Sequence, residues 1–163
     1  MSTKISKDEV LEFQKAWADN VVKVGQLYLE KKDYKNEAVN LVNNLYGYNE
    51  GTVLFKPTRA QYKEFRLTAQ SAVSYFVGQD DEYSEDTGFA LQPWVKVRFV
   101  NSGFILDTHY AITMGTYFFT DLEGREKKVE FSFGLFRTDD GKLKINLHHS
   151  SIPYLHPKHN PDR

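Results

Sequence analysis

The chain has 163 residues, a formal net charge of −1 and no cysteine, which suits one domain and excludes disulfide frameworks, thiolate nucleophiles and Cys-ligated metal centres. Because 21 basic residues balance 22 acidic ones, there is no cationic field to attract nucleic acid or an anionic membrane, and neither is expected as a partner. No apolar run approaches the ~20 residues of a membrane span, and the first residues lack the apolar stretch of a secretory signal, so a soluble cytoplasmic protein is predicted.

Three helices are predicted in the first half of the chain, each beginning with a capping residue. Ser6 and Glu9 have the spacing of a capping box, and apolar residues then recur at helical spacing. Asp33 and Thr68 are the expected caps of two shorter helices. The helices span residues 7 to about 31, 34–46 and 69–77, with a short strand over 51–57 before the last one.

An acidic segment over residues 79–87 separates the helices from the second half. Its carboxylates lack the alternation of oxygen ligands and the terminal glutamate of a calcium loop. A solvated loop is therefore predicted there.

The periodicity of apolar residues changes to two after Gly88, which predicts strands. Hairpin turns are expected at residues 101–103, 121–126 and 139–141. The predicted fold is α+β, with a cone-shaped, curved antiparallel sheet wrapped around the long first helix. A single domain over 1–155 is followed by a tail over 156–163. The four strand candidates span 90–101, 104–120, 127–138 and 142–153.

The last strand candidate ends in the four neutral polar residues HHSS. Side chains alternate between the two faces of a strand, and Leu143, Ile145 and Leu147 mark one face as the core face. His149 and Ser151 continue that face and are predicted to point inward. His148 and Ser150 are expected to point to solvent or to another subunit.

A metal site is not expected from this pattern. Adjacent histidines on a regular strand point to opposite faces and cannot ligate one ion, and the chain has no HExxH motif. Neutral polar groups instead gather near the predicted cavity, because Thr58 follows the first strand and Tyr75 lies near the end of the third helix. Such groups are expected to hydrogen-bond to one another, to water or to a small polar ligand.

Six segments, LFKPT, SYFVG, GFALQPW, MGTYFF, VEFSFGLFR and KINLHHSS, together resemble the iota-class carbonic anhydrases. That domain is related to the association domain of calcium/calmodulin-dependent kinase II, within the nuclear transport factor 2-like (cystatin-like) cone folds. The resemblance covers about residues 8 to 154. It implies a lyase that reversibly hydrates carbon dioxide to bicarbonate, and a homodimer or higher homo-oligomer. Members of the family are metal-free or metal-assisted, and no cofactor is expected for this chain, with a metal-assisted reaction as the alternative.

The resemblance also implies a catalytic pocket made of threonine, tyrosine, histidine and serine. These roles are carried onto Thr58, Tyr75, His149 and Ser151. Thr116 or Tyr117 is an alternative for the first two, and Ser150 replaces Ser151 if a bulge inverts the strand. We hypothesise a concerted reaction in which Thr58 and Ser151 hold the water, His149 takes its proton, and Tyr75 donates to the developing bicarbonate.

Two other functions stay open at this point. One is a non-catalytic oligomerisation or ligand-binding module of the kinase association-domain type, built on the outer sheet face. The other is an isomerase or dehydratase, which would need a carboxylate base in the cavity. Glu130 is expected on the face opposite Phe131 and Phe133, and the orientation of Asp107 is undetermined, so the sequence offers no clear base.

Overall fold

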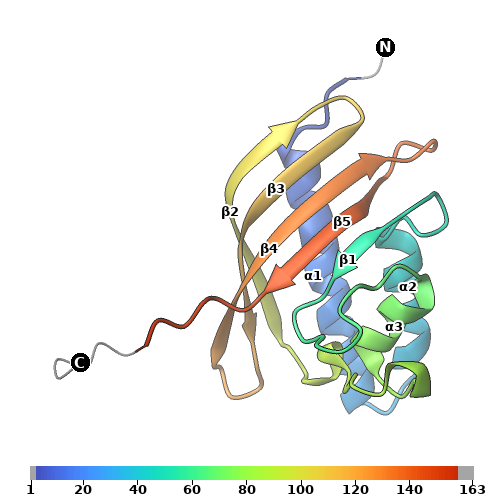
Figure 1. Ribbon diagram of the computed structural model, residues 1–163, viewed down its shortest axis with the longest axis vertical. Coiled ribbons are helices and arrows are strands. Elements are labelled where there is room, and N and C mark those ends of the chain that lie inside the picture. The colour runs from blue at the N-terminus through green and yellow to red at the C-terminus, as the bar shows by residue number, and fades with distance from the viewer. Residues whose placement is uncertain (1–2, 158–163) are drawn as a thin grey trace.

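The computed structural model describes residues 3–157, and the five strands form one curved sheet in the order β1-β5-β4-β3-β2 (Figure 1). The long helix α1 runs along the inner face of the sheet, and α2 and α3 lie beside it next to β1. This arrangement confirms the predicted α+β fold with a curved sheet around a long helix. None of the helices described is long and apolar enough to cross a membrane.

The three helices begin where the caps predict. Ser6 and Glu9 form a capping box at the start of α1, and the side chains of Asp33 and Thr68 accept backbone N–H groups at the starts of α2 and α3. The apolar stripe of α1, which includes Trp17, packs into the core. The helices are α1 (Lys7–Leu29), α2 (Tyr34–Leu45) and α3 (Ala69–Val77).

Four strands form an antiparallel meander, and β1 pairs in parallel with β5 at the sheet edge. The predicted antiparallel sheet is thus correct for the meander alone. Turns over 121–125 and 138–142 join the strands where the sequence predicts them. The strands are β1 (Leu54–Lys56), β2 (Lys96–Leu106), β3 (Tyr110–Thr120), β4 (Glu126–Arg137) and β5 (Leu143–Ser151).

The turn predicted at residues 101–103 is wrong, because β2 continues through it as a bulge. The Asn101 side chain accepts a hydrogen bond from the Gln14 amide at 2.7 Å and another from the Thr113 hydroxyl at 2.8 Å. These contacts attach the bulge to α1 and to β3. Polar residues that suggest a turn therefore anchor a continuous strand to the helix.

A second bulge lies in β5. Leu147 pairs with Gly134 and Ile145 pairs with Leu135, so Asn146 has no partner of its own in the register. A Cβ atom at position 134 would lie 2.8 Å from the Leu147 Cβ. The glycine thus provides the space for the bulge, which reverses the alternation of side chains along the rest of the strand.

Candidate active site

His148 and Ser150 point into the core, and the predicted inward orientation of His149 and Ser151 is wrong. The two inward residues are 2% and 1% exposed. His149 is exposed and Ser151 half-buried, and both line a shallow groove of 310 Å³ on the outer face of the sheet. The prediction assumed a regular strand, and the bulge at Asn146 reverses it.

A chain of hydrogen bonds begins deep in the core at Trp17. The indole Nε1–H donates to the Tyr46 hydroxyl at 3.0 Å, and this hydroxyl lies 2.9 Å from His148 Nδ1. The other ring nitrogen, Nε2, lies 3.1 Å from the Tyr117 hydroxyl. Both nitrogens of the buried imidazole are thus engaged by tyrosines from different elements.

The chain continues toward the loop that follows β1. The Tyr117 hydroxyl bonds to the Ser150 hydroxyl, which lies 2.6 Å from Thr58 Oγ1. Tyr75 joins the series through the backbone, because its hydroxyl accepts the N–H of Arg59, the residue after Thr58, at 3.2 Å. We call the series Trp17, Tyr46, His148, Tyr117, Ser150, Thr58 and Tyr75 the hydrogen-bond chain.

The available donors and acceptors determine which group donates in each hydrogen bond of this chain. An indole N–H can only donate, so the Tyr46 oxygen accepts from Trp17. Among the described residues, the Tyr46 hydroxyl has two partners, the Trp17 N–H and His148 Nδ1, so its own proton can be shared only with Nδ1. His148 then carries its proton on Nε2, and each hydroxyl donates to the next.

The imidazole of His148 lies among aromatic rings. Phe55 stacks on it with a centroid distance of 4.8 Å, and Phe133 contacts it edge-on at 4.5 Å. Burial, with a smaller effect of the neighbouring His149, lowers the pKa of His148 to about 3. The ring is therefore neutral at physiological pH.

The tyrosines of the chain are neutral as well. Burial raises the pKa of Tyr75 to about 12, although the Arg59 N–H and Thr58 offset part of that effect. Burial also raises the pKa of Tyr46 and of Tyr117. The chain is thus a set of uncharged donors and acceptors.

The Tyr75 end of the chain borders a small pocket of about 80 Å³. Two loops close it. Glu85 accepts the backbone N–H groups of residues 61–63 at 2.6, 3.0 and 2.7 Å, and the buried Asp86 pairs with Arg66 through two bonds of 2.7 Å. The pocket is lined by Arg59, Tyr75, Glu85, Asp86, Thr87 and Phe89.

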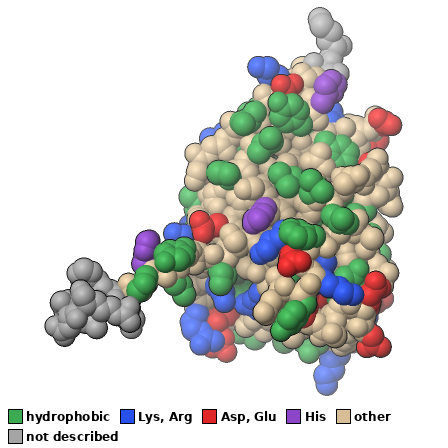
Figure 2. Space-filling view, viewed as in Figure 1, with side chains coloured by type: hydrophobic (Ala, Val, Ile, Leu, Met, Phe, Trp, Pro, Cys, Tyr) green, Lys and Arg blue, Asp and Glu red, His purple; other side chains and the backbone are tan. Residues whose placement is uncertain are grey.

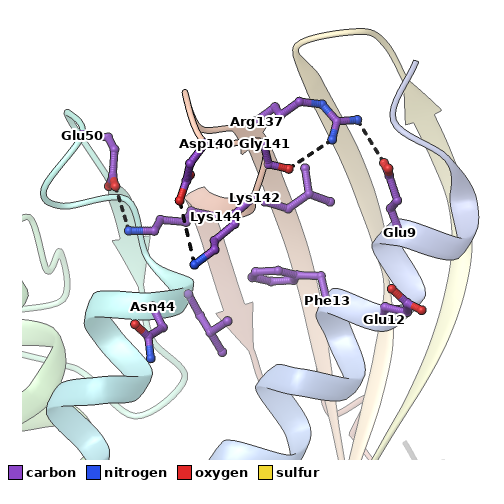
Figure 3. A pocket seen from close by; sticks show the side chains of 12 residues that line it. Glu9, Glu12, Phe13, Asn44, Glu50, Arg137, Asp140, Gly141, Lys142 and Lys144 are labelled. Carbon is purple, nitrogen blue, oxygen red and sulfur yellow. Dashed lines mark hydrogen bonds and ion pairs between the residues drawn. The ribbon is translucent and has the colours of Figure 1, made fainter. Parts of the chain in front are cut away.

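A larger cavity of 610 Å³ lies between α1, α2 and the turn that joins β4 to β5 (Figure 3). None of the residues of the hydrogen-bond chain lines it. Most of its charged groups pair with one another, for example Arg137 with Glu9 and Lys144 with Glu50. It offers no convergent catalytic groups and is not the candidate site.

The chemistry of the donor set does not suit a metal. Among residues 3–157, no group of three or more His, Asp or Glu side chains could hold a metal ion. The hydrogen-bond chain contains hydroxyls, an indole and an imidazole whose two nitrogens are both engaged. No carboxylate belongs to it, and Glu130 lies on the outer face as predicted, beside the groove that includes His149.

Known proteins match this chain along nearly its whole length. The model of the metal-independent carbonic anhydrase family matches residues 8–152. The chain belongs to this family. A metal-independent carbonic anhydrase from Nostoc sp. is 40% identical over 153 residues, which cover 92% of this chain and 75% of that protein.

Solved structures agree with the family assignment. The crystal structure of the iota-carbonic anhydrase from cyanobacterium complexed with bicarbonate has a TM-score of 0.92 and 38% identity, and covers 96% of this chain and 97% of that one. The iota-class resemblance and the cone fold are thus confirmed. A putative calcium/calmodulin-dependent kinase II association domain from Xanthomonas campestris has a TM-score of 0.56 and 20% identity, over 89% of this chain and 86% of that one, which shows the fold alone.

The structure brings some predicted residues together and leaves others apart. Thr58 and Tyr75 join the hydrogen-bond chain, and Tyr117 and Ser150, named as alternatives, join it too. Thr116 lies on the outer face. Tyr46 and Trp17 were not predicted. Their only signal is that a buried tyrosine and a buried tryptophan each need a polar partner.

Proposed function

We propose that this protein catalyses the reversible hydration of carbon dioxide to bicarbonate without a metal ion, at the Thr58–Tyr75 end of the hydrogen-bond chain. The names of its relatives support the reaction. The single observation that supports the site is the run of neutral groups that leads from the core to a small pocket.

Energetics exclude a free hydroxide ion as the nucleophile. Zinc lowers the pKa of bound water from 15.7 to about 7, so a metal-free site forgoes about 8 to 9 units, or roughly 12 kcal/mol. Neutral hydroxyls cannot replace that charge. Water therefore has to lose its proton in the same step in which it attacks carbon.

The expected step is concerted. The water oxygen bonds to the carbon of carbon dioxide while one water proton passes to Thr58 Oγ1. Thr58 passes its own proton to the Tyr75 hydroxyl, and Tyr75 passes its own proton to an oxygen of carbon dioxide, which becomes the second hydroxyl of the product. The product is carbonic acid, which releases its proton to solvent and becomes bicarbonate, and both hydroxyls keep one proton.

The pocket suits an apolar substrate on one side and a proton transfer on the other. Phe89 stacks on Tyr75 with ring centroids 5.5 Å apart, and both side chains line the pocket. Carbon dioxide can rest on this apolar wall beside the Tyr75 hydroxyl. Phe131 and Phe133 are packed in the core and do not line this pocket.

His148 is assigned a positioning role. The sequence led us to expect a histidine base with a pKa near the reference value of about 6.5, whereas the inward imidazole has a pKa of about 3. Its Nε2–H orients Tyr117, and Tyr117 orients Ser150 toward Thr58. Histidine and serine thus hold the reacting hydroxyls in one direction.

A stopped-flow hydration assay with and without a chelator tests the proposal. Full activity is expected after chelation. The matched pair His148→Ala and His149→Ala separates the two faces of β5, because only the first variant should lose activity. Equal loss in both variants, or activity that one metal restores after chelation, would contradict the assignment.

We further propose that the protein is a cytoplasmic homodimer. The outer face of the sheet supports self-association, since hydrophobic side chains lie exposed on it, among them Ile105 and Met114 at 57% and 56% (Figure 2). Light scattering at several protein concentrations tests the dimer. The cytoplasmic location rests on the sequence prediction, and the alternative of a non-catalytic module receives no support from the relatives.

A further inference from the structure

Arg59 lies at the point where the reacting hydroxyls meet the pocket. It follows Thr58 directly, and its backbone N–H donates to the Tyr75 hydroxyl. Its exposed guanidinium lies over the rings of Phe89 and Trp94, with 5.5 and 5.8 Å from the central carbon to the two centroids. One residue therefore contributes a donor to Tyr75 and a positive charge to the pocket.

The Arg59 guanidinium forms no ion pair within residues 3–157. The two carboxylates in the pocket wall are held by other donors. Asp86 accepts two bonds from Arg66 and one from the Ser74 hydroxyl at 2.6 Å, and Glu85 accepts three backbone N–H groups. Arg59 is thus the cation of this pocket whose guanidinium remains available to a ligand.

We propose that Arg59 binds the bicarbonate anion at this pocket and does not contribute to the binding of carbon dioxide. The inference rests on the proposed function, because it names the group that recognises the product of that reaction. A planar guanidinium donates two parallel N–H bonds to a carboxylate-like anion. The hydrogen-bond chain supplies neutral donors alone, so the discrimination between the charged and the neutral species falls to Arg59.

The surrounding charges keep this binding moderate. Arg66 compensates Asp86, whereas Glu85 is held by neutral backbone groups and keeps its negative charge near the pocket. A bound bicarbonate is therefore attracted by Arg59 and repelled by Glu85. Moderate affinity allows the product to leave in hydration and to enter in dehydration.

The test compares Arg59→Gln with Arg59→Lys and with Arg98→Gln. Arg98 matches Arg59 as an exposed arginine over an aromatic ring, 4.1 Å from the Phe118 centroid, but lies on β2 outside the pocket. Arg98→Gln thus controls for the loss of one positive charge. The readouts are the inhibition constant of bicarbonate in carbon dioxide hydration, the KM for carbon dioxide, and the binding of 13C-labelled bicarbonate followed by NMR.

Arg59→Gln should weaken bicarbonate inhibition and binding about tenfold, with less than about a twofold change in the KM for carbon dioxide. Arg59→Lys should lie between this variant and the wild type, and Arg98→Gln should match the wild type. The equilibrium constant of the reaction fixes the ratio of kcat/KM for hydration to kcat/KM for dehydration, so no variant can change that ratio. The inhibition constant of bicarbonate is therefore the quantity that reports on Arg59.

The inference is overturned if Arg59→Gln binds bicarbonate as tightly as the wild type, or if Arg98→Gln weakens it equally. It is also overturned if wild-type protein does not bind bicarbonate. A wild type that binds bicarbonate through Arg59 but lacks hydratase activity would refute the proposed function and leave the anion site standing. Thermal unfolding of each variant shows whether the fold is kept.

Discussion

The two ends of the hydrogen-bond chain differ in their surroundings. The inner end, Trp17, Tyr46 and His148, is sealed among aromatic rings and attached to a helix, a helix end and a strand. At the outer end, Thr58 precedes Arg59 in the loop after β1, and both Arg59 and Tyr75 line the small pocket. The inner end fixes the direction of every hydroxyl, and the outer end can perform chemistry because it reaches a place that a substrate can enter.

The largest expected effect concerns the inner end and the pH dependence of stability. The pKa of His148 is about 3 in the folded protein and about 6.5 when unfolded. Between these values the unfolded chain binds a proton and the folded one does not, so stability falls as the pH falls from about 6.5 toward 3. The loss at the low end is on the order of 5 kcal/mol.

Urea unfolding at several pH values measures this loss. His148→Asn should flatten the slope in that window, and His149→Asn should retain it. Nitrogen-15 NMR of the imidazole gives a second readout that does not need a variant. A protonated His148 at pH 5, or a neutral ring with its proton on Nδ1, would show the assigned state to be wrong.

The outer end is expected to dominate the rate. Tyr75→Phe removes the donor to carbon dioxide and should lower kcat/KM by about 10²- to 10³-fold, which is the cost of losing one oxyanion donor. Stopped-flow hydration measures it, with the exposed Tyr62→Phe as the control. A loss below about threefold would remove Tyr75 from the reacting groups.

A substitution in the middle of the hydrogen-bond chain tests whether the inner end affects the reaction at the outer end. Tyr117→Phe leaves His148 and Ser150 in place but breaks the bond between them, and should lower kcat/KM by about tenfold or more with unchanged KM for carbon dioxide. If the rate stays at the wild-type level, the inner end has only a structural role.

The smallest expected effect comes from the start of the chain. Tyr46→Phe leaves the Trp17 N–H and His148 Nδ1 without their partner, at a cost of about 1–3 kcal/mol in stability, with a few-fold loss of rate. Tyr48→Phe is the matched control, because this stacked neighbour donates to the Arg66 carbonyl outside the chain. Equal effects of both substitutions on the rate would contradict a directed chain.

Local signals predicted most of the fold. The capping residues Ser6, Asp33 and Thr68 gave the starts of the helices, since capping depends on neighbours in the sequence. The bulge in β2 was not predicted and the one in β5 was only an alternative, because bulges depend on tertiary contacts. Asn101 has a turn-forming type, but its partners Gln14 and Thr113 are distant in the sequence.

The candidate site was predicted in composition rather than in position. Thr58 and Tyr75, proposed from local motifs, lie at the outer end of the hydrogen-bond chain. The inward pair on β5 was displaced by one residue, because parity counting has no information about the bulge at Asn146. Hydrogen bonds between elements far apart, such as Trp17 to Tyr46, cannot be read from periodicity.

Gly134 lies on β4 opposite the displaced register, with no room for a side chain between it and Leu147. We expect a methyl group there to collide with Leu147 and to disfavour the bulge, whose loss would turn His149 and Ser151 inward. One histidine and one serine would still face the interior. The interior imidazole, however, would be displaced by one residue along the strand, away from Tyr46 and Tyr117. The lack of a side chain at a position that touches none of the reacting groups is thus compatible with only one of the two registers, the one in which His148 and Ser150 are buried.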